Sequence, residues 1–138
     1  LDKVFSQYIR RRFAVNEIAK CVTCGKQAHW KELQAGHFMS RKHYTTRWDK
    51  TNVQVQCSGC NVFRYGEQFK YGLYLEQAYG QGTALELQNK SREITKYNNY
   101  QLLEMWAEGR STASPVPEYE LELPSLNQDD NMTVEVIE

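Results

Sequence analysis

Two Cys-x-x-Cys pairs constrain this chain more than any other feature. Cys21 and Cys24 form the first pair, and Cys57 and Cys60 form the second, which lies 33 positions further along. Four thiolates at this spacing are typical of a zinc site in which the protein fills every tetrahedral position, so the metal is structural. Such an ion would hold together the two ends of the 21–61 segment and stabilise a small fold.

Length and composition favour one domain in a reducing compartment. The chain has 138 residues, of which 41% are apolar, enough for a modest core. It contains no apolar run of about 18 residues, so we expect no membrane span. The N-terminal residues lack the apolar core of a signal peptide. Paired cysteines in this setting favour metal over disulfides.

The net charge is zero but unevenly distributed. Residues 110–138 contain one basic and seven acidic residues, a net charge of −6, which leaves +6 on residues 1–109. The tail also holds all three prolines, so we expect it to be disordered and available to a protein partner. The basic body is typical of a domain that binds polyanions.

Residue patterns predict an α+β fold, with a small zinc-stapled core flanked by helices. We expect an N-terminal helix over 1–20, a core over 21–79 and C-terminal helices over 80–109 that offer a dimer surface. Within the core we expect a hairpin from 28–33 and 35–40, a loop over 41–52, a strand over 53–56 and an interrupted helix over 61–78. Thr83 and Glu86 predict a capping box, and a last helix should follow Asn98.

The residues between and beside the cysteine pairs suggest chemistry. His37 follows the expected first strand, Asn52 precedes the second pair, and Asn61 follows Cys60 directly. His29 and His43 are the other two candidates for a reactive histidine. This arrangement resembles the HNH, or ββα-metal, nuclease superfamily, and the Cys60-Asn61 junction is similar to that of phage recombination endonuclease VII.

A narrower resemblance covers about residues 5–108. The strings CVTCG, QAGHFMSRKHYTTRWDKTNVQVQCSGCNVFRYGE and KYGLYLEQAYGQGTALELQ resemble the NinG family of lambdoid phages, also called recombination protein Rap. The resemblance implies a structure-specific endonuclease that cuts Holliday junctions and D-loops with Mg²⁺ or Mn²⁺ in the cytoplasm of a bacterial host. A homodimer would suit the two symmetric strands of a junction.

The resemblance also implies roles for individual residues. His37 would be the general base, Asn61 a ligand of the catalytic cation, and Asn52 the residue that holds the loop and orients His37. Basic side chains around them would contact the DNA backbone. These are Arg41, Lys42, Arg47, Lys50 and Arg64.

One position departs from the superfamily pattern. HNH nucleases commonly place an acidic metal ligand directly before the base, where this chain has Gly36. Either water replaces that ligand, or His43, Asp49 or Glu67 supplies it, or the chain does not cut DNA. The last case leaves an alternative function, a non-catalytic zinc module that binds branched DNA and recruits partners.

Overall fold

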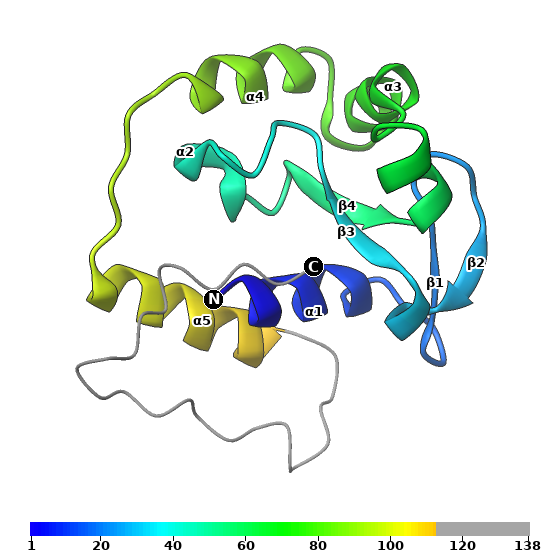
Figure 1. Ribbon diagram of the computed structural model, residues 1–138, viewed down its shortest axis with the longest axis horizontal. Helices are drawn as coiled ribbons and strands as arrows, with labels where there is room; N and C mark the ends of the chain where they lie inside the picture. Colours follow the sequence, from blue (N-terminus) through cyan, green and yellow to red (C-terminus); the bar gives the residue numbers. More distant parts are fainter. Residues whose placement is uncertain (113–138) are drawn as a thin grey trace.

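Two short antiparallel ribbons lie among the helices of this chain (Figure 1). The computed structural model describes residues 1–112, with side chains described as far as residue 108. One ribbon pairs β1 (Ile18–Lys20) with β2 (Gln27–His29), and the other pairs β3 (Gln34–His37) with β4 (Val53–Gln56). The expected mixture of helices and small sheets is confirmed.

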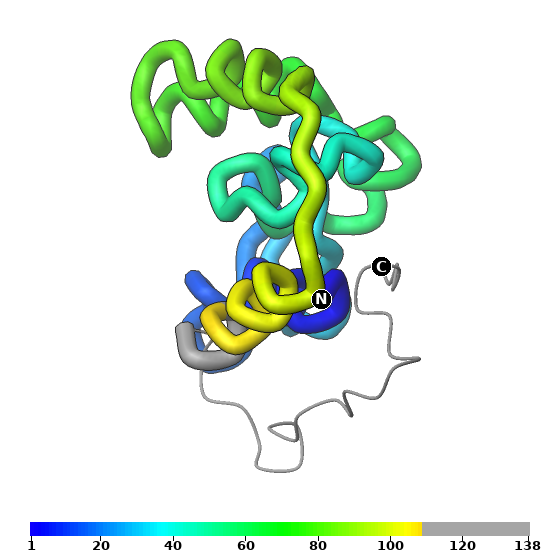
Figure 2. The backbone as a smooth tube through the Cα atoms, turned by 90° about the vertical axis from the view of Figure 1, so that its left-hand side faces the viewer, coloured from blue at the N-terminus to red at the C-terminus, as the bar shows by residue number. Residues whose placement is uncertain are grey.

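Helices cover the β3–β4 ribbon from two sides. Helices α1 (Asp2–Arg11) and α5 (Asn99–Thr112) pack together along one side, and α3 (Gln68–Tyr79) and α4 (Thr83–Ser91) lie on the other (Figure 1). Residues 92–98 run from α4 to α5 as an extended connection (Figure 2). The largest core cluster joins α1, the ribbon and α5. Its buried members are Leu1, Phe5, Tyr8, Ile9, Ala35, Trp48, Val53, Leu102 and Trp106.

The N-terminal helix is shorter than expected. It ends at Arg11, and Asn16 and Glu17 then adopt positive φ angles of 51° and 65°. These two residues reverse the chain, so Ile18–Lys20 forms a strand instead of a last helical turn. The apolar residues that extended the helical pattern beyond Arg11, Phe13 and Ile18, are 66% and 42% exposed.

The predicted hairpin of residues 28–33 and 35–40 is wrong. A 3₁₀-helix at Trp30–Glu32 separates the two runs. Strand β2 therefore pairs with β1, which precedes it in the chain, and β3 pairs with β4, which follows it. The expected loop over 41–52 contains a short helix, α2 (Tyr44–Arg47). The strand predicted over 53–56 is confirmed.

The predicted helix over 61–78 is two elements. A π-helix at Gly59–Phe63 is followed by Tyr65, Gly66 and Glu67, all with positive φ, and α3 starts only at Gln68. Helix α4 is confirmed, but its N-cap is Gly82 and not Thr83. The Glu76 carboxylate accepts hydrogen bonds from the backbone N–H groups of Gly82 and Ala84, at 2.9 and 3.2 Å, in place of the capping box.

The last helix begins as predicted after Asn98, whose Oδ1 accepts from the backbone N–H of Gln101. Residues 113–138, the acid-rich part of the predicted tail, lie outside the described residues. No helix in the described part of the chain is long and apolar enough to cross a bilayer.

Candidate functional site

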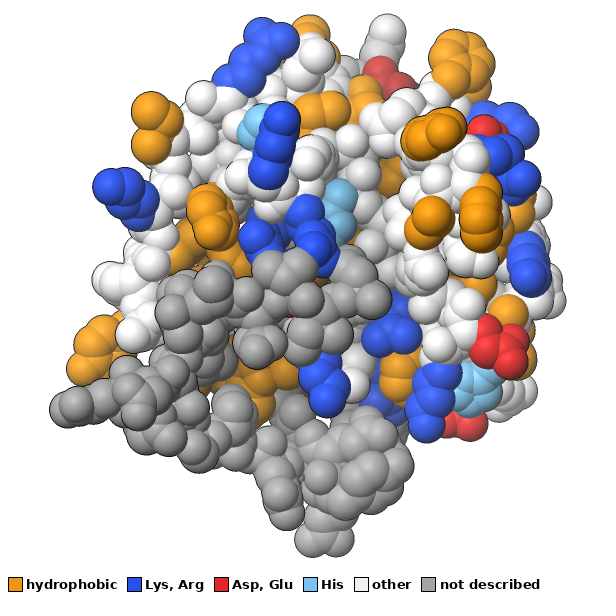
Figure 3. All heavy atoms as spheres, viewed as in Figure 1, with side chains coloured by type: hydrophobic (Ala, Val, Ile, Leu, Met, Phe, Trp, Pro, Cys, Tyr) orange, Lys and Arg blue, Asp and Glu red, His pale blue; other side chains and the backbone are white. Residues whose placement is uncertain are grey.

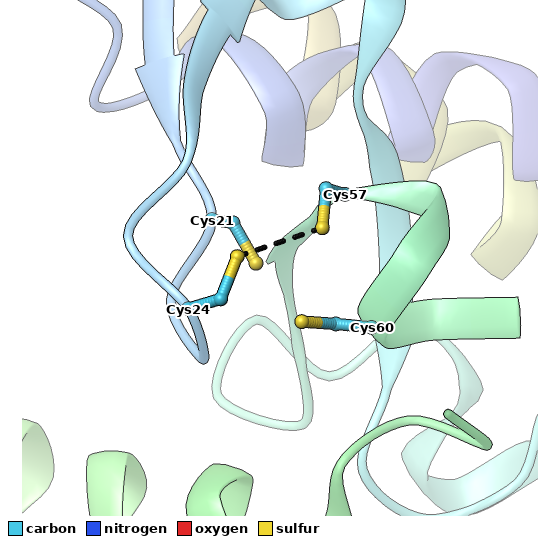
Figure 4. Close-up of side chains that lie close together, drawn as sticks. All are labelled: Cys21, Cys24, Cys57 and Cys60. Atoms are coloured by element: carbon cyan, nitrogen blue, oxygen red, sulfur yellow. Dashed lines mark hydrogen bonds between the residues drawn. The ribbon is translucent and has the colours of Figure 1, made fainter. Parts of the chain in front are cut away.

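The four cysteines converge at one end of the two ribbons (Figure 4). Cys21 and Cys24 sit on the turn between β1 and β2, whereas Cys57 and Cys60 lie just after β4 and in the π-helix. Their sulfur atoms all lie within 4.8 Å of one another, and those of Cys24 and Cys57 are 3.6 Å apart. Thiolates 2.3 Å from a tetrahedral zinc ion are roughly 3.8 Å apart, so the set fits zinc.

The thiols of the cluster influence one another's ionisation. A backbone hydrogen bond from Lys26 lowers the pKa of Cys24, but partial burial and the three neighbouring thiols outweigh it and raise that pKa to about 12. A dication between the sulfurs would reverse this balance. The Arg64 guanidinium donates to the Cys60 sulfur at 3.2 Å and so offsets negative charge on the cluster.

The cluster also positions its neighbours. Gly25 has a φ of 82°, which closes the first knuckle and brings its N–H to the Cys21 carbonyl at 2.9 Å. The Val22 N–H donates to the Val55 carbonyl at 3.0 Å, which ties that knuckle to β4. The Asn61 N–H donates to the Cys57 carbonyl at 2.9 Å. Zinc at this point would therefore fix the end of β4 and the start of the π-helix.

His37 is the last residue of β3 and is partly buried. Its Nε2 lies 2.9 Å from the Arg47 carbonyl oxygen, which can only accept, so Nε2 carries the proton and Nδ1 is left as an acceptor. Burial, the main cause, lowers the pKa of His37 to about 4, with help from the charges of Arg41 and Arg47. The backbone bond to Arg47 and the charge of Asp2 act in the opposite direction. The ring is therefore neutral at pH 7.

Asn52 is fully buried and holds the loop that follows His37. Its Oδ1 accepts from the Met39 N–H at 2.7 Å, and its Nδ2 donates to the carbonyls of Met39 and Thr46, both at 3.0 Å. Its own carbonyl accepts from the Phe38 N–H at 2.8 Å. These bonds join the two arms of the loop, and they reach the His37 region through the backbone.

Asn61 lies beside Gly36. A Cβ atom added to Gly36 would be 3.1 Å from Asn61 Oδ1, while Asn61 Nδ2 donates to Gln34 Oε1 at 2.8 Å. His37 and Asn61 do not hydrogen-bond each other within residues 1–112, and successive strand residues leave on opposite faces. The structure thus brings Asn61 to Gly36, and His37 to Arg47.

The acids considered as substitutes for the missing ligand are engaged elsewhere. Asp49 accepts from the Thr51 N–H at 2.8 Å and pairs with Lys90, at 2.5 Å. Glu67 pairs with Lys70 and Arg64, at 3.4 and 3.8 Å. The side chain that reaches position 36 instead is Gln56, which sequence reasoning missed. A glycine inside a strand often marks such a close approach, and that was the available signal.

The proposed DNA contacts differ in availability. Arg47 is an interior residue, because its guanidinium pairs with the buried Asp2 carboxylate and stacks near Tyr44 and Trp48. It therefore leaves the set of expected phosphate contacts. Lys42 is exposed, Arg41 is partly buried, and Lys50 pairs with Glu108 at 2.6 Å.

Basic side chains gather on one face of the described part of the chain. Figure 3 shows Lys and Arg side chains gathered near the middle of one face, close to a His side chain. Few Asp or Glu side chains appear among the described residues there. This distribution agrees with the net positive charge of the body of the chain.

One comparison with known families decides the relationship. A family model described as bacteriophage lambda NinG protein matches residues 1–114. The chain belongs to the NinG family. No curated protein and no solved structure gave a match.

The NinG match spans every described element, from α1 to α5. It includes the four cysteines, His37, Asn52 and Asn61. Residues 115–138, which hold all the tail acids, lie beyond it. The family relationship therefore applies to the folded body of the chain.

Proposed function

We propose that this chain is a divalent-cation-dependent endonuclease that cuts branched DNA in phage recombination, such as Holliday junctions and D-loops, in the cytoplasm of the bacterial host. The observation that carries the proposal is the state of His37. Its ring is neutral, its Nε2 is fixed on a carbonyl, and its Nδ1 remains as a proton acceptor, while the preceding residue, Gly36, lies beside Asn61 Oδ1.

The chain topology supports the same reading. The antiparallel strands β3 and β4 are followed by α3, in the strand–strand–helix order of a ββα-metal nuclease. One cysteine knuckle precedes this unit and the other lies between β4 and α3, so zinc would brace it. Membership of the NinG family supports a role in phage recombination.

In the proposed mechanism, His37 Nδ1 takes the proton of a water molecule that attacks the phosphodiester in line. A pKa of about 4 is low for a base at neutral pH, but an approaching phosphate favours the imidazolium and raises it. Asn52 keeps the loop in place, and the Arg47 carbonyl keeps the tautomer. Mg²⁺ or Mn²⁺, held by Asn61 Oδ1, would stabilise charge on the leaving 3′ oxygen.

The test compares two histidine variants on a synthetic four-way junction with Mg²⁺ or Mn²⁺. His37→Ala should lower the cleavage rate by about 10²-fold or more and leave junction binding intact. His29→Ala is the matched control, because His29 lies on the other ribbon, where it accepts from the Lys31 N–H at 3.1 Å and pairs with Glu17 at 3.5 Å. Equal cleavage by His37→Ala and the wild type would refute the assignment.

The second candidate function is the non-catalytic zinc module that binds branched DNA. Gly36 favours it, because the usual acidic ligand is missing there. A wild-type protein that binds the junction and never cuts it with either cation would establish this alternative.

A homodimer would place two such sites on the two symmetric strands of a junction. Of the side chains expected at its surface, Trp106 is buried in the core between α1 and α5. Helices α3 and α4 carry exposed apolar side chains that would be available to a partner, among them Phe69, Leu73 and Leu85. Sedimentation of wild type and Phe69→Glu would test this surface, and an unchanged dimer in the variant would exclude it.

A further inference from the structure

The strand glycine at position 36 is filled from the neighbouring strand. A Cβ atom on Gly36 would lie 1.9 Å from Gln56 Oε1 and 2.8 Å from Gln56 Cδ. Gln56 pairs with Gln34, two residues before Gly36, so its side chain emerges on the same face as position 36. The Gln56 carboxamide therefore occupies the space that a side chain at position 36 would take.

Two hydrogen bonds fix the orientation of that carboxamide. Gln56 Nε2 donates to Thr23 Oγ1 at 3.2 Å and to the Gly66 carbonyl at 2.9 Å. Both hydrogens of the Gln56 amide nitrogen are thus used. The Gly66 carbonyl can only accept, so the carboxamide atom that faces it must be the nitrogen. Thr23 belongs to the first cysteine knuckle and Gly66 follows the second, so both anchors depend on the zinc clamp.

The oxygen that remains has no partner within residues 1–112. Gln56 is fully buried, and its Oε1 is a buried atom without a hydrogen bond. Buried polar atoms are normally paired, and an unpaired one at a functional site calls for an explanation. A cation is one such explanation, because carbonyl oxygens are ligands of hard cations.

A second oxygen faces the same point. Asn61 Nδ2 is bonded to Gln34 Oε1, which leaves Asn61 Oδ1 beside position 36. The two oxygens are at most about 5 Å apart, since they lie 1.9 and 3.1 Å from the same point. Two oxygens on one Mg²⁺ ion are separated by roughly 3 to 4 Å, so a small side-chain movement would bring both onto a single ion.

We propose that Gln56 Oε1 is a ligand of the catalytic cation and, with Asn61 Oδ1, replaces the acid that position 36 lacks. The proposal rests on the proposed function and names the ligand set of that site. Both ligands are neutral, so the cation binds weakly to the protein alone and more tightly when a DNA phosphate supplies charge. This replacement of one ligand by another explains why Gly36 and Gln56 occur together, because only a residue without a side chain at position 36 leaves room for the Gln56 carboxamide.

Mn²⁺ binding to the zinc-loaded full chain tests this without any cleavage assay. In NMR spectra of the wild type, Mn²⁺ should first broaden the side-chain amide signals of Gln56 and Asn61. Electron paramagnetic resonance of free Mn²⁺ should show at least about fivefold weaker binding for Gln56→Met, which keeps the length and removes the oxygen. Gln54→Met is the matched control, because Gln54 is equally buried but its Oε1 bonds to Arg12.

Restoring an acidic residue at position 36 should have the opposite effect on Mn²⁺ affinity. The double variant Gly36→Asp/Gln56→Ala vacates the space and restores an acid, and should bind Mn²⁺ about tenfold more tightly than the wild type. Gly36→Asp alone should lose thermal stability, because its Cβ would overlap the Gln56 oxygen.

Unchanged Mn²⁺ affinity in Gln56→Met, no gain in the double variant, or no broadening at Gln56 in the wild type would overturn the proposal. Cleavage is measured separately on the same proteins. A wild type that cuts DNA while Mn²⁺ binds elsewhere would support the endonuclease function and exclude Gln56 as a ligand of the cation. A wild type that binds Mn²⁺ at Gln56 and never cuts DNA would support Gln56 as a ligand and exclude the endonuclease function.

Discussion

The cysteine cluster and the gap at Gly36 lie at opposite extremes of metal-site chemistry. The cluster offers four soft sulfur ligands, three of them buried, which is enough for every position around a tetrahedral ion. The Gly36 position has two neutral carboxamide oxygens beside it, and the Gln56 side chain already fills the space there. The comparison teaches that one ion would belong to the fold, whereas the other would belong to the complex with DNA.

The largest expected effect comes from breaking the cluster. Cys60→Ser should remove zinc and abolish cooperative unfolding, because the binding energy of a structural zinc exceeds the stability of a domain this small. Metal analysis and thermal melting would measure it. Ser58→Ala, an exposed residue in the same knuckle, should melt like the wild type. A zinc-free Cys60→Ser protein that stays folded and active would contradict the clamp.

The two asparagines near the gap should separate stability from activity. Asn52→Ala leaves buried groups of Met39 and Thr46 without partners and should lower the free energy of unfolding by about 3 kcal/mol. Asn61→Ala removes one bond, to Gln34, and should cost less than about 1 kcal/mol while ending cleavage. Urea unfolding of both variants checks the order, and equal losses would show that Asn61 is mainly structural.

The pH dependence of stability should report on His37. Its pKa is lowered to about 4 in the folded chain, below the ordinary value of 6.5, so the unfolded chain binds the extra proton first. The stability from the neutral ring is complete above pH 6.5 and is lost as the pH falls towards 4. Urea unfolding of wild type and His37→Asn at pH 7.5 and 4.5 isolates this loss, at most about 3 kcal/mol before solvent screening. Parallel pH profiles would show that the ring is not held neutral.

The smallest expected effect concerns the tail. Residues 113–138 hold seven acidic and no basic residues, so a chain ending at Thr112 should bind DNA a few-fold more tightly at low salt. The gain should fade at high salt, where charges are screened. Filter binding over a salt series measures both. Weaker binding after truncation would instead assign the tail a direct role in DNA binding.

Sequence alone predicted the parts of this molecule that depend on local spacing. The four cysteines, the strand over 53–56 and the helices after Thr83 and Asn98 follow from neighbouring residues. Strand pairing failed, because the knuckle of Cys21 and Cys24 is itself the turn of a ribbon, and adjacent runs therefore belong to different ribbons.

Contacts between distant residues were also beyond sequence reasoning. The alternation of Val53–Gln56 predicts a strand but not its surroundings, and in the structure both of its glutamines are buried. Only the register of β3 and β4 reveals that Gln56 fills the space at Gly36. Arg47 looked like a surface charge because its partner, Asp2, stands 45 residues away.

The pair of Asp2 and Arg47 links the surroundings of His37 to the first turn of the chain. The Asp2 carboxylate holds the Arg47 guanidinium and accepts from Trp48 Nε1 at 2.9 Å, while the Arg47 carbonyl sets which His37 nitrogen carries the proton. A change confined to residue 2 would thus reach the proposed base, His37, without touching any of the proposed DNA contacts other than Arg47. The packing of α1, which carries Asp2, therefore influences which nitrogen of the His37 ring carries the proton.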